Sequence, residues 1–437
     1  MMWHVISRVG STDMFTKAHA SPRVFVSLDR PGDPFLVHQL VLKRIMDLTG
    51  RVPPLRAQDL LTLATVVFAA DTQIPRRMAD DRWTRDITLY VPVVERSVWD
   101  DLTQLLIQML NFLTGDSWNI EFRERPLVET AAIRAPAEPL AVQDVALFSG
   151  GLDSLVGAID LLEAGRSVAL TGHYGAGVTN SVQQAVLSAL QARYGSRVVP
   201  FMFHVQPRKV KQSEGEQSMR SRSMLFLSLG TMVATSFEPV RRLIVSENGF
   251  ISLNVPLTGP RLGSCSTRTT HPYFMALFRE VLQALSLGVS IELPARFLTK
   301  GEMLRGARNQ ELLRAVAPLS MSCSHPEQGR WRKIKPGNHC GYCVPCIVRR
   351  ASMTAASLSD AAYDNDVLRP DVKLSVDRRK DLRAFEIAVQ RSRRASLSDA
   401  VFDVLSTGPL PPGEVGDYAS VYMRGMAEIA RFLSARQ

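Results

Sequence analysis

The segment Val145-Ala-Leu-Phe-Ser149-Gly150-Gly151-Leu152-Asp153-Ser154 decides the fold of this chain. A short apolar run, typical of a buried strand, leads into Ser-Gly-Gly-x-Asp-Ser, and helical spacing follows over residues 155–164. The two glycines let the backbone approach a pyrophosphate closely, because neither carries a Cβ. Their N–H groups and the start of the helix form a cradle for an anion. The segment therefore predicts a strand–loop–helix unit that binds phosphate.

The side chains of this loop add to the cradle. Ser149 and Ser154 can donate hydroxyl hydrogen bonds, and Asp153 is a hard oxygen ligand that suits Mg²⁺. The Lys-Ser/Thr ending of a Walker loop is absent. The hexapeptide instead resembles the PP-loop of ATP pyrophosphatases, which cleave ATP between its α and β phosphates. This resemblance implies that residues 149–154 bind ATP and Mg²⁺, that a substrate is activated as an adenylate, and that AMP and pyrophosphate are released.

Alternation of strands and helices around the loop indicates a doubly wound parallel α/β sheet. Crossover helices are expected near 155–164, 179–193 and 220–237, between apolar strands at 145–148, 168–171, 198–204, 243–245 and 289–293. Ligands of such sheets bind at the carboxyl ends of the strands. The residues that directly follow each strand are therefore the candidates for a site.

Polar residues follow several of these strands. His173 and Tyr174 come after the second strand, where the tyrosine ring could stack on adenine; packing and a turn are the alternative. Arg222 opens a helix and could meet a phosphate or carboxylate. Lys300 follows the last strand, where a point cation suits the β and γ phosphates. We expect Asp153, Arg222 and Lys300 to carry the chemistry.

The 437 residues divide into three predicted domains. Residues 1–138 are expected to form an α+β accessory domain, with strands at 24–28 and 87–91 and a helix at 99–113. The Ala/Pro/Glu stretch at 135–139 reads as a linker. Residues 139–355 hold the phosphate loop and a cysteine cluster, and residues 356–437 form a helical extension with helices near 381–390 and 421–435.

The composition is that of a soluble globular chain with a formal charge of +10. Two basic runs, at 300–350 and 378–394, indicate either a solvated face or a nucleic-acid surface. The most apolar stretch, residues 60–70, is too short for a membrane span, which needs about 20 residues. The first 20 residues lack the apolar core of a signal peptide, so we expect a cytoplasmic protein without membrane contact.

Four of the five cysteines lie close together in the sequence and predict a metal site. Tetrahedral Zn²⁺ is satisfied by four thiolates with no open position for water, so the site should be structural. Nearby basic residues, Arg349 and Arg350 among them, are expected to offset the thiolate charge. An iron–sulfur cluster or unligated cysteines are the alternatives. The expected ligands are Cys323, Cys340, Cys343 and Cys346.

The phosphate loop and the late cysteine cluster together resemble the 7-cyano-7-deazaguanine synthase (QueC) family over residues 140–355. QueC enzymes use ATP to activate the carboxylate of 7-carboxy-7-deazaguanine, form an amide with ammonia, and dehydrate it to a nitrile. The resemblance implies this carbon–nitrogen ligase chemistry here. Further segments follow the QueC order: His173-Tyr-Gly, Arg222 with Phe226-Leu-Ser-Leu, Ser246-Glu-Asn-Gly and Leu298-Thr-Lys300.

The chain departs from the QueC pattern in its substrate loop, which corresponds to residues 266–274. Where QueC enzymes carry an aspartate and a glutamate, this chain has Thr269 and Tyr273. Arg268 and His271 suit an anionic group or an altered acceptor, so Arg268, His271 and Tyr273 are the expected substrate-binding residues. With its extra domains, the chain is similar to QueC-like proteins of bacterial antiphage operons, of the Qat or type IV CBASS kind. That implies a protein partner that receives the activated deazaguanine carboxylate.

Two other functions stay open. An RNA-modifying PP-loop enzyme, such as a tRNA thiolase, would suit the basic runs. Such enzymes usually need paired reactive cysteines, whereas only Cys265 remains once a zinc site is filled, and a lone cysteine is more often a packed small residue. A non-enzymatic nucleotide-binding scaffold of a defence complex is the other alternative, but the intact motif at 149–154 argues against lost catalysis.

Overall fold

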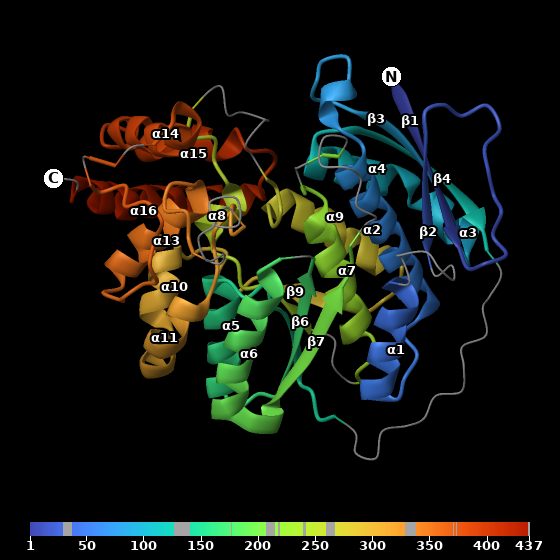
Figure 1. Ribbon diagram of the computed structural model, residues 1–437, viewed down its shortest axis with the longest axis horizontal. Helices are drawn as coiled ribbons and strands as arrows, with labels where there is room; N and C mark the ends of the chain where they lie inside the picture. The colour runs from blue at the N-terminus through green and yellow to red at the C-terminus, as the bar shows by residue number, and fades with distance from the viewer. Residues whose placement is uncertain are drawn as a thin grey trace.

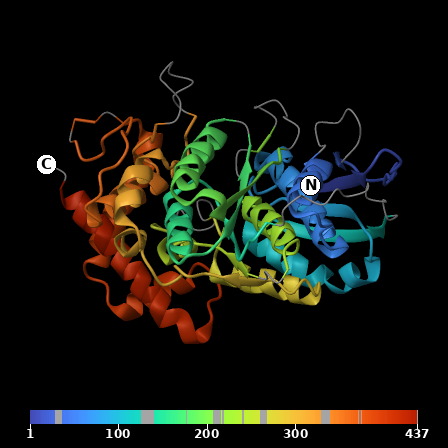
Figure 2. The same ribbon diagram turned by 90° about the horizontal axis from the view of Figure 1, so that it is seen from below.

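The computed structural model describes residues 1–28, 37–125, 140–175, 177–206, 215–216, 219–238, 242–258, 267–327, 338–369, 371–372 and 374–435. Three regions lie side by side (Figures 1 and 2). The N-terminal strands and helices, in blue, flank one side of a central sheet, in green. The C-terminal helices, in orange and red, flank the other side.

The central sheet is parallel, and each strand predicted from the sequence overlaps an observed one. The strand order is β7-β6-β5-β8-β9. The chain therefore builds outward from β5 to β7 and then crosses to the other side of β5, so that a topological switch point lies between β5 and β8. The bounds are β5 Asp144–Leu147, β6 Val168–Tyr174, β7 Val198–His204, β8 Arg242–Ile244 and β9 Ser290–Glu292.

Helices cover both faces of this sheet, because its strands are apolar on both sides. Val145 and Ala169 face the hydrophobic core shared with the N-terminal region, whereas Ala146 and Leu170 face a second core under α5 and α6. This is the doubly wound arrangement predicted from the sequence. The helices of this region are α5 Leu152–Glu163, α6 Thr179–Tyr194, α7 Arg222–Ala234, α8 Gly249–Leu253, α9 Pro272–Ala284, α10 Lys300–Gly306 and α11 Gln310–Val316.

The N-terminal region differs from the α+β unit predicted from the sequence. Its sheet has the order β2-β1-β3-β4, and all of its pairings are parallel. Helices form the crossovers from β2 to β3 and from β3 to β4, so the unit is of the α/β type. The bounds are β1 Met2–Val9, β2 Arg23–Leu28, α1 Val37–Thr49, α2 Leu55–Gln73, β3 Asp86–Val93, α3 Arg96–Asp101, α4 Thr103–Thr114 and β4 Ser117–Glu124.

One hydrophobic core joins the N-terminal region to the central sheet. Helices α2 and α7 are buried around almost their whole circumference and pack against each other. The carboxylate of Asp71 in α2 accepts hydrogen bonds from both the N–H and the hydroxyl of Ser221, each at 2.9 Å. This contact holds the start of α7. The linker predicted at 135–139 lies outside the described residues.

The C-terminal region is helical, as predicted, and has its own hydrophobic core. Its long last helix, α16, packs against α8, α13, α14 and α15. The helices are α13 Val344–Ala355, α14 Val376–Ser392, α15 Leu397–Leu405 and α16 Val415–Ser434. None of the described helices combines the length and apolar character that a bilayer span requires.

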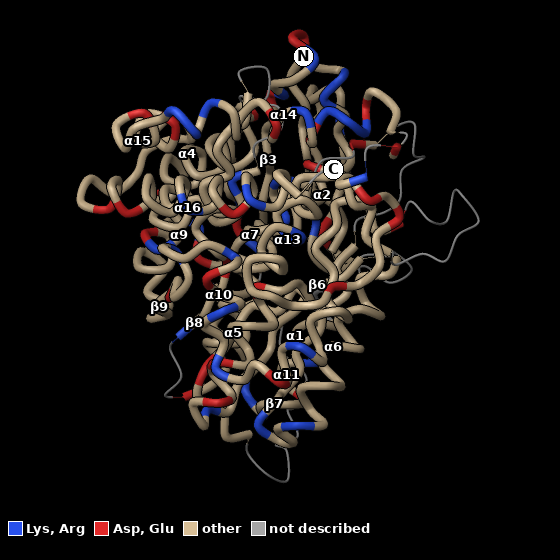
Figure 3. Tube along the Cα trace, turned by 90° about the vertical axis from the view of Figure 1, so that its left-hand side faces the viewer, with Lys and Arg blue, Asp and Glu red and all other residues tan. Residues whose placement is uncertain are grey.

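Charges of both signs are interspersed along the chain (Figure 3). Arg349 and Arg350 were expected to offset the thiolates of a zinc site, but they form ion pairs with Asp360 and Asp366, both at 2.7 Å. The expectation for these two arginines was therefore wrong, because it rested on nearness in sequence alone. The basic residues at 330–335 lie outside the described part of the chain.

Candidate nucleotide site and metal centre

The predicted phosphate loop connects β5 to α5 beside the switch point. Gly150 has a φ of +80°, a left-handed conformation that glycine adopts without strain. The hydroxyl of Ser149 accepts a hydrogen bond from the Gly151 N–H at 3.3 Å and lies 3.3 Å from the Ser154 hydroxyl. Ser154 also donates to the Gly151 carbonyl at 3.0 Å. The two serine side chains therefore stabilise the turn through these hydrogen bonds.

Asp153 is the meeting point of three strand ends. Lys300, at the start of α10, donates to Oδ1 of Asp153 at 2.6 Å, and the amide of Asn248, which follows β8, donates to Oδ2 at 2.7 Å. The side chains of Lys300 and Asp153 are 9% and 14% exposed, so the ion pair is largely shielded from water. The sequence predicts a metal ligand and a phosphate cation at these two positions, and the structure joins them to each other.

Further contacts hold Asn248 and Lys300 in place. The side-chain oxygen of Asn248 caps α8 by accepting from the Ile251 N–H at 3.0 Å, which leaves its amide group to face Asp153. Thr299 and Glu302 form a capping box around the start of α10. Glu428 of α16 accepts a hydrogen bond from the Thr299 hydroxyl at 2.7 Å. The C-terminal region therefore helps to position Lys300.

Glu247 lies in the QueC-like segment Ser246-Glu-Asn-Gly, but the sequence analysis gave this residue no role of its own. It follows β8 and accepts a hydrogen bond from the hydroxyl of Thr270. Burial raises the pKa of its carboxyl group, the negative charge of Asp153 raises it further, and Lys300 opposes the shift. Glu247 thus links the predicted substrate loop to the pair of Asp153 and Lys300. Its position directly after a strand was the available signal.

His173 and Arg222 form a second group at the end of β6. Burial, with the positive charge of Arg222, lowers the pKa of His173 to about 3, so its ring is neutral. Its Nε2 donates to the Val205 carbonyl at 2.6 Å, and its Nδ1 accepts from Nε of Arg222 at 3.3 Å. The Arg222 guanidinium lies over the Phe226 ring, 5.3 Å from its centroid. The Tyr174 ring packs on His204, with 5.3 Å between ring centroids.

Arg222 is a partly buried cation whose described partners are all neutral. It donates to His173 through Nε and, at 3.1 Å, through Nη2 to the His173 carbonyl. Burial lowers the pKa of its guanidinium, and within the described ranges no carboxylate forms an ion pair with it. A desolvated cation without a counter-ion gains free energy when it binds an anion. This geometry suits a carboxylate or phosphate group.

The three residues predicted to bind substrate pack against the N-terminal region. Arg268 donates to the Phe112 carbonyl at the end of α4, at 2.7 Å, and stacks on the Phe112 ring. His271 is fully buried, with Nε2 at 2.8 Å from the Thr407 hydroxyl and Nδ1 capping α9 at the Tyr273 N–H. The Tyr273 hydroxyl meets the Gln108 amide of α4. Cys265 lies outside the described residues.

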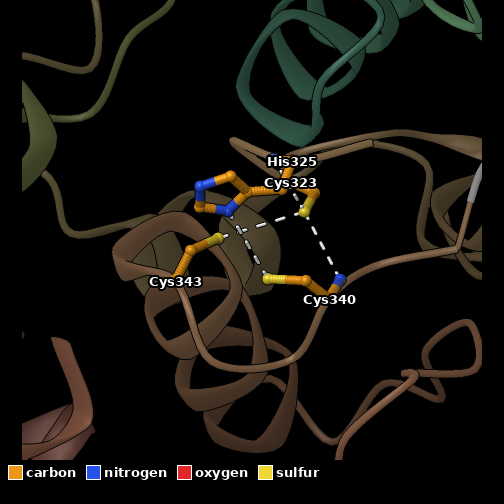
Figure 4. A group of neighbouring side chains, drawn as sticks. All are labelled: Cys323, His325, Cys340 and Cys343. Carbon is orange, nitrogen blue, oxygen red and sulfur yellow. Dashed lines mark hydrogen bonds between the residues drawn. The ribbon is translucent and has the colours of Figure 1, made fainter. Parts of the chain in front are cut away.

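The clustered cysteines converge as predicted, and His325 joins them (Figure 4). One ligand atom from each of Cys323, His325, Cys340 and Cys343 lies within 4.8 Å of the others. The sulfur of Cys346 is 3.8 Å from that of Cys340. Sulfurs of a tetrahedral zinc site are about 3.8 Å apart, as Zn–S bonds of about 2.3 Å require. The donors therefore fit zinc, with five candidates for four positions.

The close contacts among the sulfurs shift the pKa values of the thiols in opposite directions: those of Cys323 and Cys340 fall, whereas those of Cys343 and Cys346 rise. Contacts with the thiols of Cys340, Cys343 and Cys346 lower the pKa of Cys323, and the Cys340 N–H donates to its sulfur at 3.3 Å. A contact with Cys343 raises the pKa of His325, which is exposed. Sequence spacing did not identify His325, because it lies outside the run in which Cys340, Cys343 and Cys346 are each separated by two residues.

A short segment connects the cysteine cluster to the phosphate loop. The Met321 N–H donates to the Gly150 carbonyl at 3.1 Å, two residues before Cys323. Glu327 accepts from the Val178 N–H at the start of α6, at 2.6 Å. Arg349 of α13 holds the Ser320 carbonyl at 3.1 Å. The metal centre and the phosphate loop are therefore parts of one packed unit.

Comparison with known proteins gives a distant relative for about half of the chain. No family model matches the chain. A 7-cyano-7-deazaguanine synthase from Novosphingobium aromaticivorans is 29% identical to it over 246 residues, which cover 52% of this chain and 94% of that protein. The chain has the α/β fold, the loop and the cysteine cluster that its sequence predicts. Over half of its length it is a distant relative of a 7-cyano-7-deazaguanine synthase.

Proposed function

We propose that this protein is an ATP-dependent enzyme that adenylates the carboxylate of a 7-deazaguanine and forms a carbon–nitrogen bond from it. The observation that carries the proposal is the convergence of the phosphate loop, Asn248 and Lys300 on Asp153 at the switch point of the sheet. The similarity to a 7-cyano-7-deazaguanine synthase supports the choice of substrate class.

The reaction needs little covalent chemistry from the protein. The substrate carboxylate attacks the α-phosphorus of ATP, and pyrophosphate leaves with the electrons of the broken P–O bond. An amine then attacks the acyl carbon of the adenylate and AMP leaves, which gives an amide. Dehydration of that amide with a second ATP would give a nitrile. The site's task is to position the reactants and to stabilise the charge on the phosphates.

The described residues divide this task between them. The loop at 149–154 cradles the phosphates, and Lys300 supplies the cation beside them. Arg222, which lacks a described counter-ion, holds the carboxylate or the α-phosphate. Mg²⁺, when bound, would neutralise phosphate charge. Asp153 would bind this Mg²⁺ ion, and its ion pair with Lys300 would then be partly replaced by the bond to the metal. The cysteine cluster would hold zinc as a structural ion, because protein ligands would fill all four positions.

The acceptor of the activated carboxylate is the finer part of the proposal. Thr269 and Tyr273 replace the acidic residues of the QueC substrate loop, and Tyr273 contacts α4 of the N-terminal region. These features support an altered second step. We propose that its nucleophile is an amine of a protein partner and that the reaction serves cytoplasmic antiviral defence. Ammonia is the other candidate nucleophile, and it would lead to an amide or nitrile of free deazaguanine.

The test uses the purified full-length chain with ATP, Mg²⁺ and 7-carboxy-7-deazaguanine. We expect AMP and pyrophosphate, and no ADP, by nucleotide chromatography. Release of ADP and phosphate without AMP would reject the PP-loop assignment. Mass spectrometry of proteins from neighbouring genes, co-expressed with the chain, should show a deazaguanine-sized increase on one of them. In the same assay with ammonium added, complete conversion to free nitrile by the chain alone would reject a protein acceptor.

A further inference from the structure

A buried amide, Gln183 of α6, holds the backbone of the phosphate loop. Its Nε2 lies 3.3 Å from each of three carbonyl oxygens, those of Phe148, Ser149 and His173. The side chain is completely buried. The first two carbonyls belong to the loop itself, and the third belongs to the end of β6. Gln183 therefore ties the loop to the neighbouring strand.

These contacts determine where the loop's N–H groups point. In a planar trans peptide the carbonyl and the following N–H point in opposite directions. Because the carbonyls of Phe148 and Ser149 point at Gln183, the N–H groups of Ser149 and Gly150 point away from α6. Neither N–H has a partner among the residues that the structure describes. They are therefore available to an anion bound on the open side of the loop.

The amide of Gln183 fits this place in one orientation. Exchanging its oxygen and nitrogen would bring Oε1 against three carbonyl oxygens, which repel it. In the observed orientation Oε1 is buried and has no partner within the described structure. A Cβ at Gly150 would lie 3.0 Å from Cγ of Gln183, so the glycine and the glutamine are packed against each other. An unsatisfied buried oxygen is a cost that stability alone does not explain.

We propose that Gln183 is a positioning residue for ATP, which orients the N–H groups of Ser149 and Gly150 toward the phosphates. The inference rests on the proposed ATP site and extends it to a helix that contributes no residue to the phosphate-loop motif. Its ligand is the pyrophosphate part of the nucleotide, because two adjacent N–H groups and a positive helix end recognise phosphate oxygens.

The test compares Gln183→Met with Gln184→Met in the full chain. Gln184 is the next residue of α6 and is exposed, so it provides a matched control. Binding is measured by calorimetric titration with α,β-methylene ATP and separately with inorganic pyrophosphate. Gln183→Met should bind each ligand at least about tenfold more weakly than the wild type. Binding by Gln184→Met should equal that of the wild type. Thermal unfolding without ligand should show that all three proteins are folded.

A second variant separates positioning from packing. Gln183→Glu has nearly the same shape, but its carboxylate faces three carbonyls as an acceptor. Its affinity relative to wild type should improve as the pH falls, because the protonated carboxyl regains one donor. Equal binding by wild type and Gln183→Met would overturn the role of Gln183 but would leave the proposed ATP site in place. Absence of binding by the wild type would overturn the ATP site and this inference with it.

Discussion

At the scale of single residues, the candidate site depends on charges that are held away from water. Asp153 and Lys300 neutralise each other in a largely dry environment, whereas Arg222 has only neutral partners in the described structure. A buried ion pair contributes modestly to stability, but removal of one partner leaves an uncompensated charge. The same residues that suit phosphate chemistry therefore make the site sensitive to single substitutions.

Asp153→Ala should abolish AMP formation and also destabilise the protein. Loss of the carboxylate leaves Lys300 without its counter-ion, and we expect the free energy of unfolding in urea to fall by about 3 kcal/mol. Adding Lys300→Met should restore much of this stability without restoring activity. As a surface control, Asp47→Ala breaks the exposed pair with Lys43 and should cost less than about 1 kcal/mol. Unchanged stability of Asp153→Ala would contradict the pairing.

His271 should make stability depend on acid pH. Burial lowers its pKa from the ordinary 6.5 to about 3. Between these values the unfolded chain binds a proton that the folded chain does not bind, so stability falls as the pH drops below about 6.5. His271→Asn keeps a side chain that can cap α9, and should reduce the slope by up to about 1.4 kcal/mol per pH unit. Urea unfolding from pH 7 to pH 4 measures this slope.

Thr407→Val provides the control for His271. It removes the hydroxyl that lies 2.8 Å from the histidine ring but leaves the titrating group in place. Stability should fall at every pH, while the slope stays that of the wild type. An unchanged slope in His271→Asn would show that the ring is accessible to water, as the predicted substrate-binding role requires.

At the scale of elements, the segment between Ser320 and Glu327 is the connection that matters most. It contacts the phosphate loop through Met321, the start of α6 through Glu327 and the cysteine cluster through Cys323. Metal binding in such a cluster contributes directly to folding. Loss of the metal should therefore disturb the phosphate loop as well as the metal centre.

Metal content should distinguish the five candidate ligands. We expect about one zinc per chain in the wild type and in His325→Ala, but little zinc in Cys346→Ser, because Cys346 is fully buried whereas His325 is exposed. Cys343→Ser removes a ligand in the same way, and both serine variants should be less soluble than the wild type, because zinc binding contributes to folding. Elemental analysis of the purified proteins checks this. Loss of zinc from His325→Ala alone would assign His325 as the fourth ligand, and stoichiometric iron with visible colour would reject zinc.

At the scale of the whole molecule, the N-terminal region is part of the core and not an appended module. Helix α7 is buried around almost its whole circumference, and α2 packs against it on the side away from the central sheet. Asp71 adds two hydrogen bonds to Ser221, directly before Arg222. The N-terminal region thereby supports both the stability of the sheet and the position of a site residue.

A variant that lacks residues 1–138 should therefore be insoluble. It would expose the apolar surface of α7 that α2 covers, and large exposed apolar patches lead to aggregation. The fraction of protein in the supernatant after expression measures this, with the full chain as reference. A soluble product that unfolds cooperatively would show that residues 139–437 form an independent domain.

The sequence by itself determined the features that depend on local patterns. The phosphate loop, the alternation of strands and helices in the central sheet, and the convergence of the four cysteines follow from short-range spacing, and the structure contains them. The N-terminal sheet was predicted less well. The sequence analysis predicted neither β1 nor β4 as a strand. Because both lie in the N-terminal sheet, its parallel pairing could not be predicted either.

Only the tertiary structure decided which side chains meet at the site. Lys300 and Asp153 are 147 residues apart, and their contact depends on the order of strands in the sheet. The same is true of Glu247, whose segment resembles QueC but whose role the sequence did not give, and of Gln183, which no motif identified. The sequence placed His271 in a substrate loop, but the structure buries it against Phe112 and Thr407. Burial and pairing depend on long-range packing, and a pattern of neighbouring residues does not contain that information.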